Sequence, residues 1–255
     1  MRILIKLGGT LLDDPGSLPR LAGEITAAAP NNQIVVVHGG GKQMTRFLAE
    51  RGIESRFVAG LRVTTPEIID AVVKVFAGSV NTQLVAAFRA AGARPVGLTG
   101  LDAGLVDAEV LHADLGLVGK PAHSDARLLE LLVREHYLPV IACVAGDVQG
   151  HIFNVNADQM AVACAKSFHV EKLLFLTDVE GVRDGQGLTR AILAAAEAVE
   201  LIRAGVATGG MQAKLEAALS ALSEGAEEVL IAPGAKPGVV GMLLSGSPIG
   251  TRLLP

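Results

Sequence analysis

The strongest constraint on the fold is a regular alternation of short apolar runs with helical segments. Runs rich in Val, Ile and Leu have the length of strands at residues 3–7, 33–38, 94–99, 138–144, 172–177 and 227–232. Helical patterns fill most of the gaps, at residues 18–29, 42–51, 66–91, 125–136, 158–169, 194–204 and 210–224. This alternation predicts an α/β fold in which crossover connections build a parallel sheet covered on both faces.

The composition agrees with such a fold and disfavours other classes of protein. Of the 255 residues 50% are apolar, only 3% are aromatic and Trp is absent, so aliphatic side chains must fill the interior. A net charge of −4 disfavours a nucleic-acid-binding surface, which needs clustered Lys and Arg. No apolar run approaches the roughly 20 residues of a membrane span and no signal peptide is visible, so we expect a cytoplasmic protein without a membrane partner.

Both cysteines lie in apolar segments. Cys143 lies in LPVIACVAG and Cys164 in the helical stretch ADQMAVACAKSF. A thiol in such surroundings usually behaves as a small buried hydrophobe. Two cysteines of this kind predict neither a disulfide framework nor a zinc site.

The alternation loosens between residues 101 and 123 into two short pieces, LVDAEVLH and LGLVG. These pieces predict a β-hairpin that departs from the main sheet, as a lid would. A boundary between two lobes is placed near residue 168, before the strand KLLFLTD.

A glycine triplet at residues 39–41 separates the second predicted strand from the helix that follows it. At such a turn, backbone N–H groups and the helix dipole favour an anion. The turn is not a P-loop, because Lys42 is followed by Gln43, and it is not a dinucleotide fingerprint, because Met44 stands where glycine is required. A tight turn without a ligand is the alternative.

Two lysines stand at unusual positions. Lys6 lies near the end of the first strand, two residues before the pair Gly8 and Gly9, at the sheet edge where ligands bind in folds of this class. Lys214 lies in the first turn of a predicted helix, where the dipole disfavours a cation by roughly a few tenths to 1 kcal/mol. A nearby anion would explain both lysines. The alternatives are a snorkelling strand lysine and a solvated helix lysine.

The segment HIFNVNADQMA places Asn154, Asn156 and Asp158 at alternate positions. In an extended segment all three side chains would lie on one face. That is more polar character than a helix cap needs, although capping alone would explain Asp158.

These motifs occur in the order IKLGGTLL, VVVHGGG, AGLRVT, FNVNADQ, LTDVEGV and TGGMQAK, and together they resemble the amino-acid kinase family over nearly the whole chain. Within that family the resemblance points to members that phosphorylate N-acetyl-L-glutamate in arginine biosynthesis. It implies a three-layer αβα sandwich around an open, mainly parallel eight-stranded sheet. It also implies an N-terminal lobe, residues 1–168, that binds the acyl amino acid and forms a homodimer, and a C-terminal lobe, residues 169–255, that binds ATP.

The resemblance further implies roles for individual residues. Lys6 and Lys214 would stabilise the transferring phosphoryl group, and Asp158 would position both. The residues implied for the amino-acid substrate are Gly40, Gly41, Arg62, Asn154 and Asn156. Those implied for ATP are Gly8, Gly9, Asp178, Gly181, Val182, Arg183, Val206, Ala207 and Thr208. No residue is implied as a direct metal ligand, because Mg²⁺ would bind through the phosphates of ATP.

The implied reaction explains why the motifs carry cations and no general base. A carboxylate with a pKa near 4.3 is already ionised at neutral pH. Its approach to a polyphosphate costs roughly 4 kcal/mol for each unit charge pair at 4 Å and an effective dielectric near 20. Lys6, Lys214 and Mg²⁺ would offset this repulsion. Arg62 suits an α-carboxylate and Asn154 a neutral acetamide, whereas the histidines are expected to be structural, His38 being the one worth testing.

Other functions remain open at this stage. Aspartate kinase and glutamate 5-kinase typically add C-terminal modules, which this chain lacks up to Pro255. A kinase of a carrier-linked aminoadipate, or an inert metabolite sensor with the same fold, is also compatible, but a sensor would not need both lysines. Because the first strand starts at residue 2, we expect a homodimer with little arginine feedback, and helix 66–91 is a candidate dimer surface.

Overall fold

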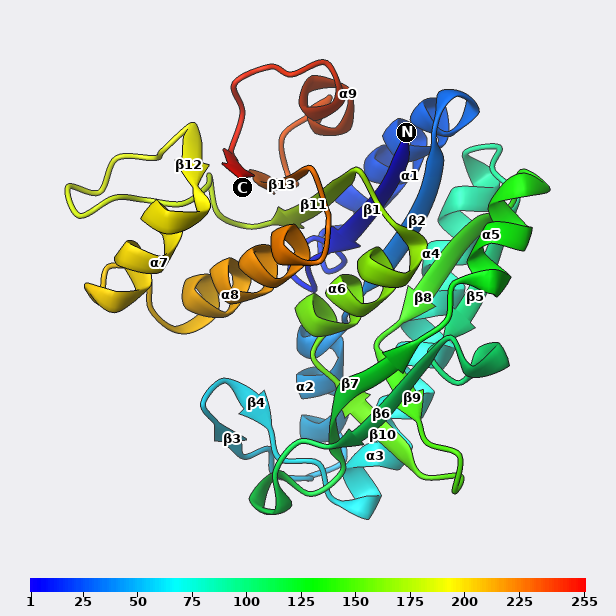
Figure 1. Cartoon of the computed structure of the whole chain (residues 1–255). Helices are drawn as coiled ribbons and strands as arrows, with labels where there is room; N and C mark the ends of the chain where they lie inside the picture. Colours follow the sequence, from blue (N-terminus) through cyan, green and yellow to red (C-terminus); the bar gives the residue numbers. More distant parts are fainter.

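A sheet of eight strands forms the centre of the molecule, and the computed structural model describes residues 1–255 (Figure 1). Its strand order is β12-β14-β13-β11-β1-β2-β8-β5. The strands are β1 (Arg2–Leu7), β2 (Gln33–His38), β5 (Pro95–Thr99), β8 (Leu138–Ala142), β11 (Lys172–Thr177), β12 (Ile192–Ala194), β13 (Glu228–Pro233) and β14 (Thr251–Leu254). Every neighbouring pair is parallel except β13 and β14. The predicted eight-stranded, mainly parallel sheet is confirmed.

Helices cover the sheet on both faces, which explains why its central strands are apolar throughout. On one face α1 (Ser17–Ala28) packs against α4 (Asn81–Ala90) and α9 (Val239–Leu244), and on the other α6 (Ala157–Phe168) packs against α8 (Gly209–Ser223) (Figure 1). The remaining helices are α2 (Gly41–Ala49), α3 (Pro66–Val72), α5 (Arg127–Arg134) and α7 (Ala195–Arg203), with 3₁₀ turns at Ala29–Asn31, Asp102–Gly104 and Ala113–Leu115.

The helix predicted over residues 66–91 is continuous but not uniform. It begins as α3, with an N-cap at Thr65, whose hydroxyl accepts the Ile68 N–H. It continues as a π-helix over Val73–Val80 and ends as α4. Each π-helical turn holds more residues than an α-helical turn, so the segment rotates the side chains that follow it relative to those before.

The same helical run corrects the expectation that no segment approaches membrane-span length. Pro66–Ala90 is long and apolar enough, by length and composition, to cross a membrane. In this structure α4 packs against α1, β5 and β8 instead.

The hairpin predicted over residues 101–123 forms from β6 (Val106–Val110) and β7 (Val118–Ser124). It is not an isolated excursion, because β9 (Val144–Gly146) and β10 (Ile152–Val155) close it into a small barrel of order β10-β7-β6-β9. The single strand predicted over residues 138–144 is therefore wrong. The chain leaves the main sheet after β8 and enters the barrel as β9.

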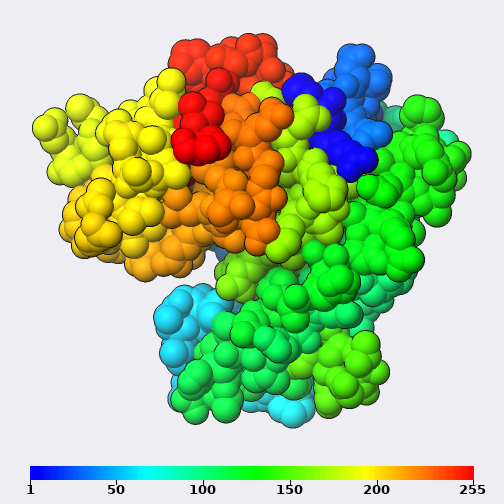
Figure 2. All heavy atoms as spheres, in the orientation of Figure 1, coloured from blue at the N-terminus to red at the C-terminus, as the bar shows by residue number.

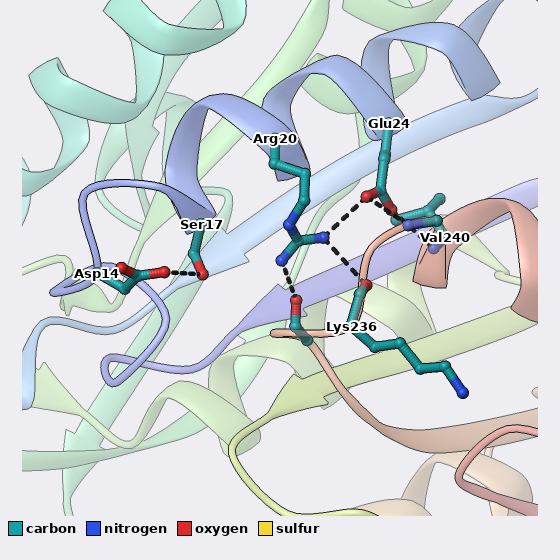
Figure 3. Close-up of polar contacts among 8 residues, drawn as sticks. Asp14, Ser17, Arg20, Glu24, Lys236 and Val240 are labelled. Atoms are coloured by element: carbon teal, nitrogen blue, oxygen red, sulfur yellow. Dashed lines mark hydrogen bonds and ion pairs between the residues drawn. The ribbon is translucent and has the colours of Figure 1, made fainter.

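Two contacts of α1 attach the C-terminal part of the chain to the first helix. Figure 3 shows Arg20 and Glu24 of α1 facing the segment that joins β13 to α9. Arg20 donates to the carbonyl oxygens of Gly234 and Lys236 and pairs with Glu24 at 2.8 Å. The Glu24 carboxylate accepts the backbone N–H groups of Gly238 and Val240, at the start of α9. In the same view Ser17 donates to Asp14 ahead of α1.

Candidate active site

Lys6 and Lys214 meet at a single carboxylate near the carboxyl edge of the sheet. Lys6 Nζ lies 2.7 Å from Asp158 Oδ1, and Lys214 Nζ lies 3.5 Å from Asp158 Oδ2. The lysines come from β1 and from the second turn of α8, and Asp158 comes from the first turn of α6. The structure thus brings together three residues that lie far apart in the sequence.

The buried carboxylate of Asp158 stays ionised because of its neighbours. Burial alone would raise its pKa, but the positive charges of Lys6 and Lys214 outweigh that effect, and the pKa is lowered. The Asp158 and Lys6 side chains are 8% and 9% exposed, so water screens their attraction little. Lys6 and Asp158 form a close ion pair. The ammonium group has three N–H donors, so it retains hydrogen-bonding capacity beyond this contact.

The three polar residues of FNVNAD do not share one extended face, because β10 ends at Val155 and α6 begins at Ala157. Asn156, not Asp158, is the N-cap of α6, and its Oδ1 accepts the N–H groups of Asp158 and Gln159 at 2.8 and 3.2 Å. Asn154 donates to Thr64 Oγ1 at 3.1 Å. The cap explains how Asp158 is held, and the substrate role of the two asparagines stays a prediction.

The two glycine turns lie against each other. A Cβ atom added to Gly9 would lie 3.3 Å from the nitrogen of Gly41, so the two backbones approach closely at this point. The N–H groups of Gly9, Gly40 and Gly41 have no hydrogen-bond partner in the protein. The Gly8 N–H donates to the carbonyl oxygen of Leu176 at 2.9 Å and is not free for a phosphate, so the place of Gly8 in the ATP site stays a prediction that rests on other contacts.

Arg62 is a buried cation without an acidic partner. It lies in the hairpin of β3 (Phe57–Val58) and β4 (Leu61–Arg62), is 7% exposed, and burial lowers its pKa. Its guanidinium donates to the Ser55 hydroxyl, to Thr45 Oγ1 at 2.8 Å and to Gly41 O at 3.2 Å, and it stacks on the Phe57 ring. A buried guanidinium held only by neutral groups is suited to an anionic ligand. Sequence reasoning missed the supporting residues, because only the fold brings them to Arg62.

The residues expected around ATP differ in how accessible they are. Asp178 follows β11, and its pKa is lowered despite partial burial, because backbone and hydroxyl groups hydrogen-bond the carboxylate. Val182 is buried and its N–H donates to Thr251 Oγ1 at 2.7 Å. Ala207 is also buried, so its side chain, like that of Val182, belongs to the core. The exposed positions in this set are Asp178, Arg183, Val206 and Thr208. Gly181 has a positive φ of 146° and no space for a Cβ beside Thr251.

Two cavities of about 690 Å³ lie around these groups. One joins the two glycine turns to the Arg62 guanidinium and the Asp178 carboxylate, with Thr10 and Lys42 in its wall. The other lies between α6, α8, β7 and the β3–β4 hairpin. Figure 2 shows an indentation between the hairpin and α8 on this side of the molecule. Sequence reasoning had not assigned Thr10 or Lys42 to the site, although Thr10 directly follows Gly9 in the motif.

The two cysteines and His38 are buried side chains that the candidate site does not use. Burial raises the pKa of both Cys143 and Cys164 to about 12, which confirms that they are buried thiols of low reactivity. His38 is fully buried, and burial lowers its pKa to about 4. A residue that stays neutral near pH 7 agrees with a structural role.

A parallel sheet, glycine turns at its carboxyl edge and two lysines on one aspartate make up the candidate site. The sequence pattern of the Amino acid kinase family matches residues 1–233. The chain belongs to this family.

Its relatives narrow the class further. The acetylglutamate kinase of Solibacter usitatus (strain Ellin6076) is 58% identical over 255 residues, covering 100% of this chain and 99% of the relative. Among solved structures, N-acetylglutamate synthase from Neisseria gonorrhoeae, complexed with coenzyme A and N-acetyl-glutamate, has a TM-score of 0.88 at 25% identity. That match covers 100% of this chain and 59% of the synthase chain. Carbamate kinase from Giardia lamblia bound to AMP-PNP has a TM-score of 0.75 at 17% identity, covers 99% of this chain and 98% of that chain, and supports the fold alone.

Proposed function

We propose that this protein transfers the γ-phosphoryl group of ATP to the side-chain carboxylate of N-acetyl-L-glutamate, giving N-acetyl-L-glutamyl 5-phosphate in arginine biosynthesis. The observation that carries the proposal is the convergence of Lys6 and Lys214 on the buried carboxylate of Asp158. The 58% identity to an acetylglutamate kinase over the full chain supports the choice of substrate.

The reaction needs charge compensation and alignment. The attacking carboxylate is already ionised, so no residue has to remove a proton. Asp158 neutralises one of the two ammonium charges, which leaves a net positive charge beside the glycine turns. The ammonium groups of Lys6 and Lys214 would approach the phosphoryl oxygens and stabilise their negative charge as the bond to ADP breaks. The Asp158 carboxylate holds both ammonium groups in place, and its pKa is low enough to keep it charged.

The acyl amino acid would lie on the side of Arg62. The Arg62 guanidinium would pair with the α-carboxylate, and the free N–H groups of Gly40 and Gly41 would bind the reacting carboxylate. Asn154 and Asn156 would contact the acetamide, since each retains amide hydrogen-bonding capacity. An N-acylated substrate fits this set, because its neutral amide needs no acidic partner.

The nucleotide would lie on the side of residues 169–255, with the N-terminal lobe, residues 1–168, holding the amino acid. Gly9 would offer its N–H to a phosphate, and the exposed residues Arg183, Val206 and Thr208 would line the site. No group of three or more His, Cys, Asp or Glu side chains could hold a metal ion by itself. Mg²⁺ would bind through the ATP phosphates and would supply further charge neutralisation, with Asp178 in the wall of the adjoining cavity.

We also propose a cytoplasmic homodimer. The helical run Pro66–Ala90 leaves Ile69, Val73, Ala77 and Val85 only partly buried against the core. A second copy of the chain would cover this apolar strip and the neighbouring edge strand β5, which pairs only with β8.

A substrate comparison tests the proposed function. A coupled assay of ADP release would compare N-acetyl-L-glutamate with glutamate, aspartate, a carrier-linked aminoadipate and UMP. We expect turnover with acetylglutamate and little with the free amino acids, whose ammonium groups find no acidic partner here. Turnover confined to the carrier-linked substrate would reassign the enzyme, and ligand binding without turnover of any substrate would identify a sensor.

A further inference from the structure

His38 is a buried imidazole that the phosphoryl transfer does not use. It ends β2, directly before the glycine triplet, and is 0% exposed. Its Nδ1 lies 2.8 Å from the carbonyl oxygen of Gly39. A carbonyl oxygen can only accept, so Nδ1 carries the proton and Nε2 must be an acceptor.

Asn81 completes a hydrogen-bonded chain with a single possible direction. Its Nδ2 lies 2.9 Å from His38 Nε2 and 2.9 Å from the carbonyl oxygen of Val140. The amide nitrogen thus donates one proton to β8 and the other to the imidazole. The amide oxygen of Asn81 lies against Gly97 of β5. Only glycine leaves room for it there, because a Cβ atom would lie 2.1 Å from Asn81 Oδ1.

Two side chains of the π-helical segment pack against the glycine triplet. A Cβ added to Gly40 would lie 2.7 and 2.8 Å from two ring atoms of Phe76 and 3.4 Å from Val80 Cγ2. Phe76 and Val80 belong to the π-helix, and Asn81 is the first residue of α4 after it. The wider helical turn sets the register in which all three residues face the glycine triplet.

We propose that His38 and Asn81 are positioning residues for the glycine turn, and that the π-helical segment Val73–Val80 sets this contact. Together they fix the Gly39 carbonyl oxygen on one side while Phe76 fills the space behind Gly40. The free N–H groups of Gly40 and Gly41 are then held ready for the attacking carboxylate. This inference rests on the proposed function, in which those N–H groups bind the acyl amino acid.

Isosteric substitutions test the proposal. His38→Phe and Asn81→Leu each remove the hydrogen bonds at little change in volume. Each is expected to lower kcat/KM for N-acetyl-L-glutamate by about 10- to 100-fold, because displacement of a binding group by a fraction of an ångström is costly. KM for ATP should change less than about twofold, because the glycine triplet is proposed to contact the acyl amino acid and not the nucleotide. The double variant should lose no more than the worse single variant, because both substitutions break one chain.

Phe88→Leu is the matched control. Phe88 is also fully buried and lies on α4, but it does not contact the turn. It should lower the melting temperature without changing kcat/KM. Equal kinetic losses in the control and in His38→Phe at matched stability, or additive losses in the double variant, would overturn the proposal.

A ¹⁵N NMR spectrum of the histidines provides a readout that does not depend on turnover. The wild type should show a neutral His38 protonated at Nδ1, and Asn81→Leu should disturb that signal. The Nε2 tautomer would contradict the hydrogen-bond chain, whatever the substrate of the enzyme. Absence of acetylglutamate turnover together with the Nδ1 tautomer would instead refute the proposed function alone.

Discussion

The charges of the individual residues explain why an acidic protein can bind two anionic substrates. The chain carries a net charge of −4, yet its site combines two ammonium groups, one shared carboxylate and an Arg62 guanidinium without an acidic partner. The local charge is therefore positive where the reacting groups would meet. Because these side chains are mostly buried, the field acts at short range and is weakly screened.

Arg62 should contribute to binding more than to turnover. Arg62→Ala is expected to raise KM for N-acetyl-L-glutamate by about 10- to 100-fold, the equivalent of one or two charge-assisted hydrogen bonds. Arg62→Lys should recover only part of this loss, since an ammonium lacks the planar fork. Steady-state kinetics would measure the effect, with the exposed Arg56→Ala as control. A fall in kcat with KM intact would contradict the binding role.

The buried imidazole of His38 predicts how stability depends on pH. Its pKa falls from 6.5 in the unfolded chain to about 4 in the folded protein. As the pH falls, the imidazole is protonated in the unfolded chain before it is protonated in the folded protein. The contribution of His38 to the free energy of unfolding is therefore fully present above pH 6.5 and is lost as the pH falls toward 4. The loss is on the order of 3 kcal/mol.

Urea unfolding at several pH values would measure this effect. Between pH 7 and pH 4, the His38→Phe variant should lose less unfolding free energy than the wild type. The exposed His169→Asn variant should follow the wild type. Parallel curves for wild type and His38→Phe would show that the buried imidazole does not titrate as stated.

At the scale of elements, the periodicity of apolar residues predicted the longer helices and strands, whose pattern is contained in the local sequence. The ranges of β2 and β11 agree with the predicted strands, and α6 and α8 differ from prediction by one residue at each end. Sequence reasoning missed β12, β14 and α9, which are too short to show a period, and the β3–β4 hairpin, whose turn places Ala59 at φ 48° beside Gly60. Sequence reasoning could not predict the barrel, because β9 and β10 are recognisable as strands only through their pairing with β6 and β7.

The contact of α1 with the start of α9 should stabilise the C-terminal part of the sheet. Glu24→Ala removes a carboxylate that accepts two backbone N–H groups and pairs with Arg20. The expected loss is about 1 to 3 kcal/mol of unfolding free energy, because two donors lose a charged acceptor. Denaturant unfolding would measure it, with the exposed Glu54→Ala as control. Equal stability of the two variants would mean that water replaces the carboxylate without cost.

At the scale of the whole molecule, the proposed homodimer depends on the half-buried strip of the helix Pro66–Ala90. Light scattering at micromolar concentration should give twice the chain mass of 26.2 kDa. Val73→Asp places a charge in the strip and should shift the population toward monomer. The exposed substitution Gln83→Asp should not. A wild-type monomer or hexamer would contradict the proposed assembly.

The candidate site illustrates what a sequence can and cannot predict. The motifs identified Lys6, Asp158 and Lys214, and the order of β1, α6 and α8 in a parallel fold accounts for their meeting. The motifs could not show that Asn156 caps α6, that the Gly8 N–H is engaged, or that Phe76 fills the space behind Gly40. Those facts depend on tertiary contacts that no local pattern encodes.

The most direct measurement is kcat for Lys6→Ala and Lys214→Ala with saturating ATP and N-acetyl-L-glutamate, beside the exposed control Lys236→Ala. If the two ammonium groups stabilise the migrating phosphoryl group, each loss should lower kcat by about 10²-fold or more while the control keeps wild-type turnover. A rise in KM with kcat unchanged in both variants would show that these lysines only bind substrate, and would contradict the proposed mechanism.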